Sequence, residues 1–245
     1  MAASRSQAGA AIRVVADPHS RPTIAVHWIK NSVLAAILGA VTSLLMYGLR
    51  SAAGATAADA GFGAMLISCV AAIGLWALWG AASAVLTGAV LQRVIPWLPV
   101  RAWIGLHLAM AATGGGGSEI ALNALPDTSD TPATDDAPMA AMLVVGFFLG
   151  VIAGSLAGGL EALVLRRAAS GTAAWIMCSI ASFAIAMSIA AGGGMMLSDA
   201  GNGFVRELAV QAVAFLALVL VSPIMLPALR RLRSRTLPAA GWSSV

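Results

Sequence analysis

Two titratable side chains lie within long apolar runs, and their chemistry is the first question that the sequence raises. His107 lies one helical turn beyond Trp103, in a run that starts at Ala102. An imidazole inside a membrane can hydrogen-bond to a neighbouring helix, or it can ligate the metal of a haem or chlorophyll-type pigment. No second histidine lies at helical spacing from His107. We therefore favour a hydrogen-bonded packing role, and cofactor binding by His107 is the alternative.

Glu161 is the second titratable candidate, and it lies in the run from Met139 to Leu165. It is about one helical turn from the basic end of that run, where a carboxylate can reach towards water or pair with Arg93, Arg166 or Arg167. This structural role is favoured. The alternative is an ion or proton site, as a transporter would use.

Two tryptophans, Trp76 and Trp79, lie near the middle of the run from Phe62 to Leu91. A spacing of three places both rings on one face of a helix, where they can stack on a planar cofactor or fill the space opposite small residues. Large rings packed against glycines are common in membrane helices, so space filling is favoured over cofactor binding.

The motifs of common catalytic and metal sites are missing from the sequence. It contains no Cys-x-x-Cys, no His-Glu-x-x-His, no glycine-rich phosphate loop followed by lysine, and no Gly-x-Ser-x-Gly. We therefore expect no enzymatic activity and assign no catalytic residue and no metal ligand. The sequence requires no cofactor, although it is compatible with a bound lipid or pigment.

The composition places the chain in a membrane. Of its 245 residues, 60% are hydrophobic and only 10% are charged, with 26 glycines and a mean hydropathy of +0.90. Soluble domains do not reach such values. The net charge of +4 does not indicate a nucleic-acid partner, because the basic residues are scattered singly or in pairs between apolar runs.

Six apolar runs predict an all-α integral membrane protein with six transmembrane helices. Helices are the only architecture these runs allow, because glycine-rich open strands cannot satisfy their backbone groups in lipid. The last span should kink at Pro223 and Pro227. The six-helix domain occupies residues 27–229, after an N-terminal segment (1–26) and before a basic tail (230–245). We predict spans at about residues 27–49, 62–91, 102–122, 139–165, 172–191 and 204–229, with an acidic outer loop at 123–138.

The distribution of charge predicts the orientation. Short cytoplasmic loops retain Lys and Arg, and placing both termini in the cytoplasm leaves only Arg50 and Arg206 on the outer side. The acidic loop then lies outside. We predict a multi-pass protein of a bacterial-type inner membrane. Four tryptophans fall at the expected inner interface, where amphipathic rings are enriched: Trp28, Trp97, Trp103 and Trp175.

The segment Leu160–Ile176 has a diluted copy at Leu86–Ile104. Both contain a leucine, Val-Leu-x-Arg, a break and Ala-Trp-Ile. This predicts two parallel helix-hairpin repeats, formed by the second and third spans and by the fourth and fifth. Glu161 has no counterpart, because Thr87 occupies its place. The arginines of the two turns are expected to fix topology or contact lipid headgroups: Arg93, Arg101, Arg166 and Arg167.

Small residues recur at every fourth position in the first helix of each hairpin. This spacing places them on one face, where backbones can approach closely, so helix packing is favoured. A smooth groove for a lipid, a carotenoid-like pigment or a partner helix is the alternative. The residues are Gly80, Ala84 and Gly88 in one hairpin and Gly146, Gly150, Gly154 and Gly158 in the other.

Two functions are compatible with these features. The favoured one is a non-catalytic accessory subunit that packs against a larger membrane complex, energy-transducing (respiratory or photosynthetic) among others, and binds lipid or pigment. Its partners would be membrane lipids and other membrane-protein subunits. The alternative is a small-solute or lipid transporter that uses Glu161, but the spans contain few polar groups from which to build a path.

Overall fold

The computed structural model describes residues 20–56, 62–117, 139–197 and 203–235, and these are almost entirely helical. The N-terminal part has α1 (Ser20–Thr56), α2 (Phe62–Val94), α3 (Val100–Ala111) and η1, a π-helical turn (Ala112–Gly116). The C-terminal part has α5 (Met139–Leu165), β1 (Ala169–Ser170), α6 (Thr172–Met196), α7 (Gly203–Val221), the 3₁₀ turn η3 (Ser222–Met225), α8 (Leu226–Arg231) and β2 (Arg233–Ser234).

Five of the described helical segments are long and apolar enough to cross a membrane, as expected for an all-α membrane protein. They are Pro22–Leu49, Leu66–Val94, Met139–Leu165, Thr172–Met196 and Phe204–Arg231. The described part of the third expected span is shorter. At about 1.5 Å per residue, α3 and η1 together cover roughly 25 Å of a hydrocarbon core of about 30 Å. Residues 118–122 lie outside the described ranges, so a sixth span stays a prediction.

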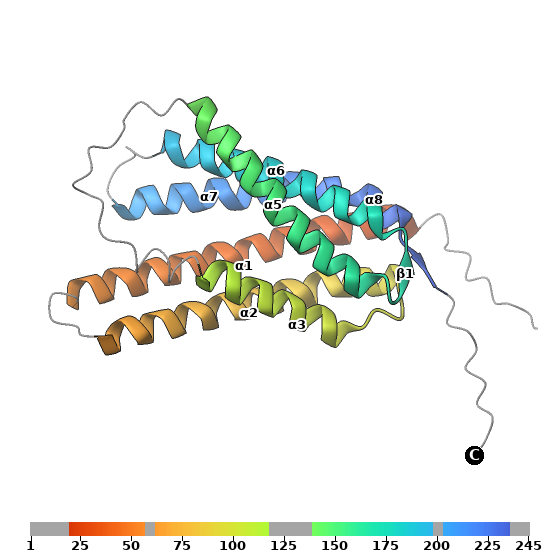
Figure 1. The fold of residues 1–245 in the computed structure, drawn as a ribbon, viewed down its shortest axis with the longest axis horizontal. Helices are drawn as coiled ribbons and strands as arrows, with labels where there is room; N and C mark the ends of the chain where they lie inside the picture. The colour runs from red at the N-terminus through yellow and green to blue at the C-terminus, as the bar shows by residue number, and fades with distance from the viewer. Residues whose placement is uncertain (1–19, 57–61, 118–138, 198–202, 236–245) are drawn as a thin grey trace, which may run out of the picture.

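The helices form two groups that lie side by side (Figure 1). In one, α1 and α2 run antiparallel and α3 returns along α2; in the other, α5 crosses obliquely over the bundle and packs along α6, which packs on α7. The groups meet where α1 contacts α7 and where α3 contacts α5. Each group therefore contributes a wall to the space between them.

The small residues of α5 lie against α6. Gly146, Gly150, Gly154 and Gly158 are all buried. A Cβ atom on Gly154 would lie 2.7 Å from the Cα of Ile180, and a Cβ on Gly150 would clash with the backbone of Phe183 and Ala184. This face is filled by α6, so it leaves no open groove of the kind considered from the sequence.

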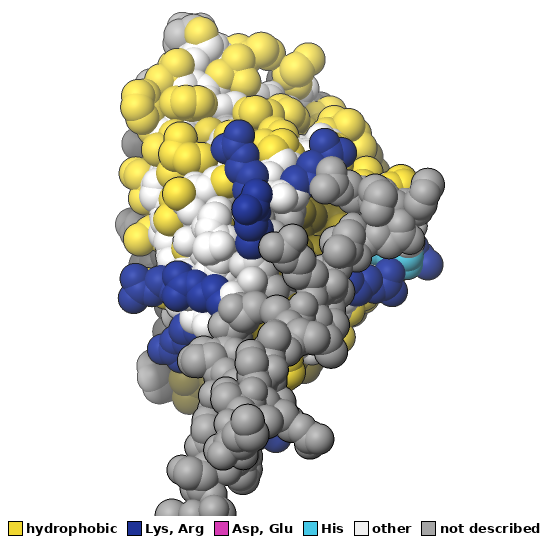
Figure 2. All heavy atoms as spheres, turned by 90° about the vertical axis from the view of Figure 1, so that its right-hand side faces the viewer, with side chains coloured by type: hydrophobic (Ala, Val, Ile, Leu, Met, Phe, Trp, Pro, Cys, Tyr) yellow, Lys and Arg dark blue, Asp and Glu magenta, His cyan; other side chains and the backbone are white. Residues whose placement is uncertain are grey.

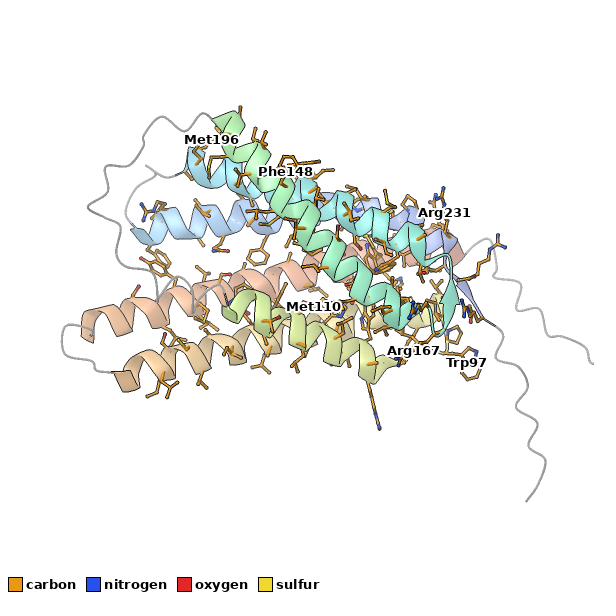
Figure 3. The ribbon with its side chains drawn as sticks, in the orientation of Figure 1. Trp97, Met110, Phe148, Arg167, Met196 and Arg231 are labelled. Atoms are coloured by element: carbon orange, nitrogen blue, oxygen red, sulfur yellow. The ribbon has the colours of Figure 1, made fainter. Side chains whose placement is uncertain are left out.

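The basic helix ends meet at one end of the bundle. Figure 2 looks onto this end and shows Lys and Arg side chains spread over it. Arg167 and Arg231 are labelled there in Figure 3, beside the exposed Trp97. Behind them lies the larger apolar core, which contains Ile95, Leu165 and Leu229.

A short strand pair ties the turn after α5 to the chain after α8. β1 and β2 are antiparallel, with Ala169 opposite Ser234, and Arg235 N–H donates to Ala168 O over 2.9 Å. Gly171 follows with a φ of 86°, and a side chain there would meet Arg231 O. Only glycine adopts this conformation readily.

The last span bends where its prolines were expected to kink it. The α-helix is interrupted at Ser222–Met225, whose 3₁₀ turn contains Pro223, and α8 then begins with Pro227 in its first turn. Pro223 has no N–H for the preceding turn, which accounts for the break. The described part of the chain ends at Arg235, the sixth residue of the predicted tail.

Three of the four tryptophans expected at the membrane interface lie inside the bundle. Trp28, Trp103 and Trp175 are buried, and only Trp97 is exposed. Each buried indole N–H has an acceptor on a neighbouring helix, which removes the cost of burying it. Residues 1–19, the acidic loop and residues 236–245 lie outside the described ranges.

Candidate functional site

A cavity of about 640 Å³ lies between the two groups of helices. Its wall is built from α1, α2, α3, η1, α5, α6, α7 and η3, and most of it is apolar. Small-molecule sites in proteins typically measure 300–1,000 Å³, roughly, and combine an apolar wall with a few placed polar groups. Met110, labelled in Figure 3, is one of its apolar lining residues. The cavity therefore has the size and character of a site for a drug-sized ligand.

His107 and Glu161 meet on the cavity wall. His107 Nε2 lies 3.0 Å from Glu161 Oε1, and the two side chains are only 15% and 14% exposed. His107 comes from α3 and Glu161 from α5, so the contact joins the two groups of helices. A carboxylate and an imidazole at this distance share a hydrogen bond.

Further hydrogen bonds hold both members of the pair in place. Trp175 Nε1 donates to Glu161 Oε2 over 2.7 Å. His107 Nδ1 lies 3.0 Å from Trp103 O, one turn earlier in α3. Trp103 Nε1 in turn donates to Thr87 Oγ1 on α2 over 3.3 Å. The polar groups thus form a network that links α2, α3, α5 and α6.

Aromatic rings pack together beside this network. Trp175 makes edge-to-face contacts with Trp28 and with Trp103, at centroid distances of 5.9 and 6.1 Å. The His107 ring lies 4.4 Å from that of Trp103. Such contacts orient rings and restrict their motion. The carboxylate of Glu161 therefore occupies a rigid aromatic setting.

Several polar atoms of the lining residues are buried without a hydrogen-bond partner. They are Trp76 Nε1 and the hydroxyl oxygens of Ser83, Ser182 and Ser222. Buried polar groups are usually paired, and an unpaired one costs about 1–3 kcal/mol.

The two tryptophans singled out by their depth both line the cavity. They do not present parallel faces, because the rings of Trp76 and Trp79 meet edge to face at a centroid distance of 5.5 Å. Trp79 Nε1 donates to Ala35 O over 2.9 Å. A Cβ atom on Gly115 would clash with the Trp76 ring, so this tryptophan packs against a glycine of η1.

The arginines of the turns are separated from this site. Arg93, Arg101, Arg166 and Arg167 are exposed and none is a lining residue. Glu161 therefore pairs with a histidine on another helix, whereas the sequence favours an arginine as its partner. The reason is geometric, because Glu161 lies on the inward face of α5 and the arginines extend outward at its end.

The sequence contains a signal for the His107–Glu161 contact in the depths of the two residues. Counted from the basic helix ends, Glu161 lies five residues before Arg166 and His107 six residues after Arg101. At about 1.5 Å per residue these are nearly equal depths. Two titratable residues at one depth on neighbouring spans can pair, and their pairing removes the cost of leaving either one alone in lipid.

Pigment ligation by His107 would disturb this arrangement. One ring nitrogen contacts Glu161 and the other lies against Trp103 O, so an axial metal would have to displace one of these partners. Among the described residues no group of three or more His, Cys, Asp or Glu side chains could hold a metal ion.

Comparisons with protein-family models, with curated proteins and with solved structures find no match to this chain. The cavity and its polar network are therefore the features that point to a function.

Proposed function

We propose that this protein is a small membrane transporter that binds a mainly apolar, drug-sized molecule in the cavity between its two groups of helices. The observation that carries the proposal is the contact of His107 with Glu161 on an otherwise apolar wall. Ionisable groups inside a membrane are costly, and they commonly occur on substrate, ion or proton pathways. A packing role alone would not require both groups to face a cavity.

The binding site is separate from the small-residue face of α5, although Gly80 from the small-residue face of α2 contributes to its lining. The glycine face of α5 is covered by α6, whereas the cavity is lined by Trp76, Trp79 and the polar pair. The three residues considered for cofactor binding therefore become ligand-binding residues in this proposal, together with Glu161.

We also propose that the chain contains the two parallel helix-hairpin repeats expected from the sequence. Their support is a pair of equivalent hydrogen bonds, Trp103 to Thr87 in the first hairpin and Trp175 to Glu161 in the second. Gly80 packs against His107 O and Gly154 against Ser179 O, which are also equivalent positions. We infer that a shared scaffold acquired a carboxylate in one copy only.

The orientation follows from the basic end of the bundle. We propose that this end faces the cytoplasm, that both termini lie there and that the membrane is a bacterial inner membrane. A cysteine at the exposed Ser170, introduced into a variant lacking Cys69 and Cys178, should then react with a membrane-impermeant maleimide only from the cytoplasmic side. Labelling of intact cells from outside would reverse the orientation.

The binding proposal can be tested with a neutral photoreactive probe. Purified protein in lipid nanodiscs would be irradiated with a diazirine-bearing long-chain alcohol, and the labelled residues mapped by mass spectrometry. We expect labels on α3, α5 and α6 residues that line the cavity. Ala157→Phe should abolish these labels because Ala157 lines the cavity, whereas Ala140→Phe on the exposed face of the same helix should preserve them. Equal labelling of the lining residues in all three proteins would contradict the proposal.

The accessory-subunit role is the second candidate, and one observation favours it. α5 is the least buried of the five apolar spans, with 17% of its apolar window buried, and it exposes Phe147 and Phe148. Figure 3 shows Phe148 on the outer side of this helix. Purification in mild detergent followed by mass spectrometry should recover a stoichiometric partner, and Phe148→Ala should release it. Recovery of the chain alone would exclude this role.

A further inference from the structure

The described lining of the cavity contains a carboxylate but no lysine or arginine. Among the described lining residues, only Glu161 and His107 are titratable. α3 contributes the histidine, α5 contributes the carboxylate, and the lining residues of α1, α2, α6 and α7 carry no charge. Lys30 on α1, Arg93 on α2, Arg101 on α3 and Arg230 on α8 are exposed and lie outside the lining. The contacts of His107 with Trp103 O and with Glu161 require a proton shared by the pair, which is then neutral overall, and loss of that proton leaves one negative charge on the wall.

The aromatic side chains of the wall also favour a positively charged ligand. Trp28, Trp76, Trp79 and Trp175 all line the cavity. The face of an indole ring attracts cations, and aromatic walls with few polar groups bind quaternary ammonium ions. An organic anion would meet the same ring faces and the carboxylate with the opposite sign. Both features therefore select positive charge.

We propose that the ligand is a lipophilic organic cation, and that cation binding and protonation of the His107–Glu161 pair exclude one another. This inference rests on the proposed transporter function and names its substrate class. When the pair takes up a proton its net charge becomes zero and the attraction for a cation is lost. When a cation binds, the proton leaves to solvent, so that one positive charge replaces another at the pair.

The geometry allows this exchange. Glu161 keeps one oxygen on Trp175 Nε1 and the other on His107 Nε2, so the carboxylate stays positioned while the proton content of the pair changes. Exchange of a proton for a cation at one site is the minimum requirement for an antiporter.

Tetraphenylphosphonium and tetraphenylborate provide a matched test, because they have nearly the same shape and opposite charge. Binding of each to the purified full-length protein in detergent would be measured by isothermal titration calorimetry. We expect the cation to bind at least about tenfold more tightly than the anion, and Glu161→Gln to remove this preference. Titrations in buffers of different ionisation enthalpy should report release of about half a proton per bound cation at the midpoint of the pH dependence, rising towards about one proton at lower pH.

Three further variants keep the result interpretable. Glu161→Asp retains the charge and should retain the preference for the cation even if affinity falls. His107→Gln keeps the carboxylate and should bind the cation with a changed pH dependence. Lys30→Gln, which alters an exposed charge outside the cavity, should behave as the wild type.

The contrary outcomes are distinct. Equal affinity for the two ions, or unchanged cation binding in a folded Glu161→Gln protein, would overturn the assignment of a cationic substrate. If the neutral photoreactive probe still labels the cavity in that case, the binding function stands and only the substrate class is wrong. If the neutral probe and both ions fail to bind, the proposed function and this inference fall together.

Discussion

Glu161 Oε1 lies 3.0 Å from His107 Nε2, and this contact joins α5 to α3 across the boundary between the two groups of helices. The other carboxylate oxygen accepts the indole N–H of Trp175 on α6. A single side chain thus has partners on two helices, beside a cavity. Its removal should affect both the packing of the bundle and the binding of ligand.

Replacing Glu161 by leucine should lower the stability of the bundle. The substitution leaves His107 Nε2 and Trp175 Nε1 without acceptors in a largely buried setting. Hydrogen bonds between membrane helices contribute less to stability than the cost of two unpaired buried donors would suggest. We therefore expect a loss of about 1–2 kcal/mol in the free energy of unfolding. Glu161→Gln should lose less, because its amide oxygen can still accept one bond. Unfolding in mixed micelles followed by circular dichroism measures both values, and equal stability of Glu161→Leu and wild type would contradict the network.

The packing of α5 on α6 can be tested with two glycines of the same helix. Gly150→Ala places a methyl group against the backbone of Phe183 and Ala184, where no side-chain rotation can relieve the clash. We expect a loss of about 1–3 kcal/mol. Gly159→Ala has nothing within 4 Å of its new Cβ and should be neutral or stabilising by up to about 1 kcal/mol, because alanine is the better helix former. Thermal unfolding in detergent compares them, and equal effects would show that the helices do not approach as closely as described.

The membrane class, five of the six apolar spans and the helix interruption near Pro223 could be predicted from the sequence, because each depends on a local property of the chain. Composition and run length decide the first two, and the missing N–H of proline decides the third. The candidate site residues were also named, since a titratable residue in an apolar run is conspicuous by itself.

Their arrangement could not be predicted, because it depends on how helices rotate and cross. Trp103 and Trp175 read as interfacial residues, but close packing of the helices places both inside. Glu161 was matched to the nearest arginines along the chain, whereas the rotation of α5 directs it to His107. The cavity itself has no signature in the sequence, because residues from eight elements build it. These features belong to tertiary packing, which periodicity does not encode.

Gly171 should be the least replaceable residue of the basic end. Alanine there would require a left-handed backbone, which costs about 1–2 kcal/mol, and its Cβ would also meet Arg231 O. We expect Gly171→Ala to separate β1 from β2 and to expose the chain after Arg231 to trypsin. Ser170→Ala, at the exposed neighbouring position, is the control and should leave the cleavage rate unchanged. Equal cleavage rates for both variants and the wild type would indicate that the strand pair does not hold the tail.

Trp175 and Trp76 allow a hydrogen-bonded indole N–H to be compared with an unpaired one. Trp175 Nε1 donates to Glu161, whereas Trp76 Nε1 is buried on the cavity wall without a partner. Phenylalanine keeps most of the ring and removes the N–H. Trp175→Phe should therefore lower the free energy of unfolding by about 1 kcal/mol, and Trp76→Phe should leave it unchanged or raise it, because an unsatisfied donor is removed. Chemical unfolding of the ligand-free protein provides this comparison. If the Trp76 N–H binds a ligand, Trp76→Phe should also weaken the binding of a hydrogen-bond-accepting ligand while the fold is preserved. A destabilised Trp76→Phe protein would contradict this prediction, because it would show that the Trp76 N–H has a partner within the bundle.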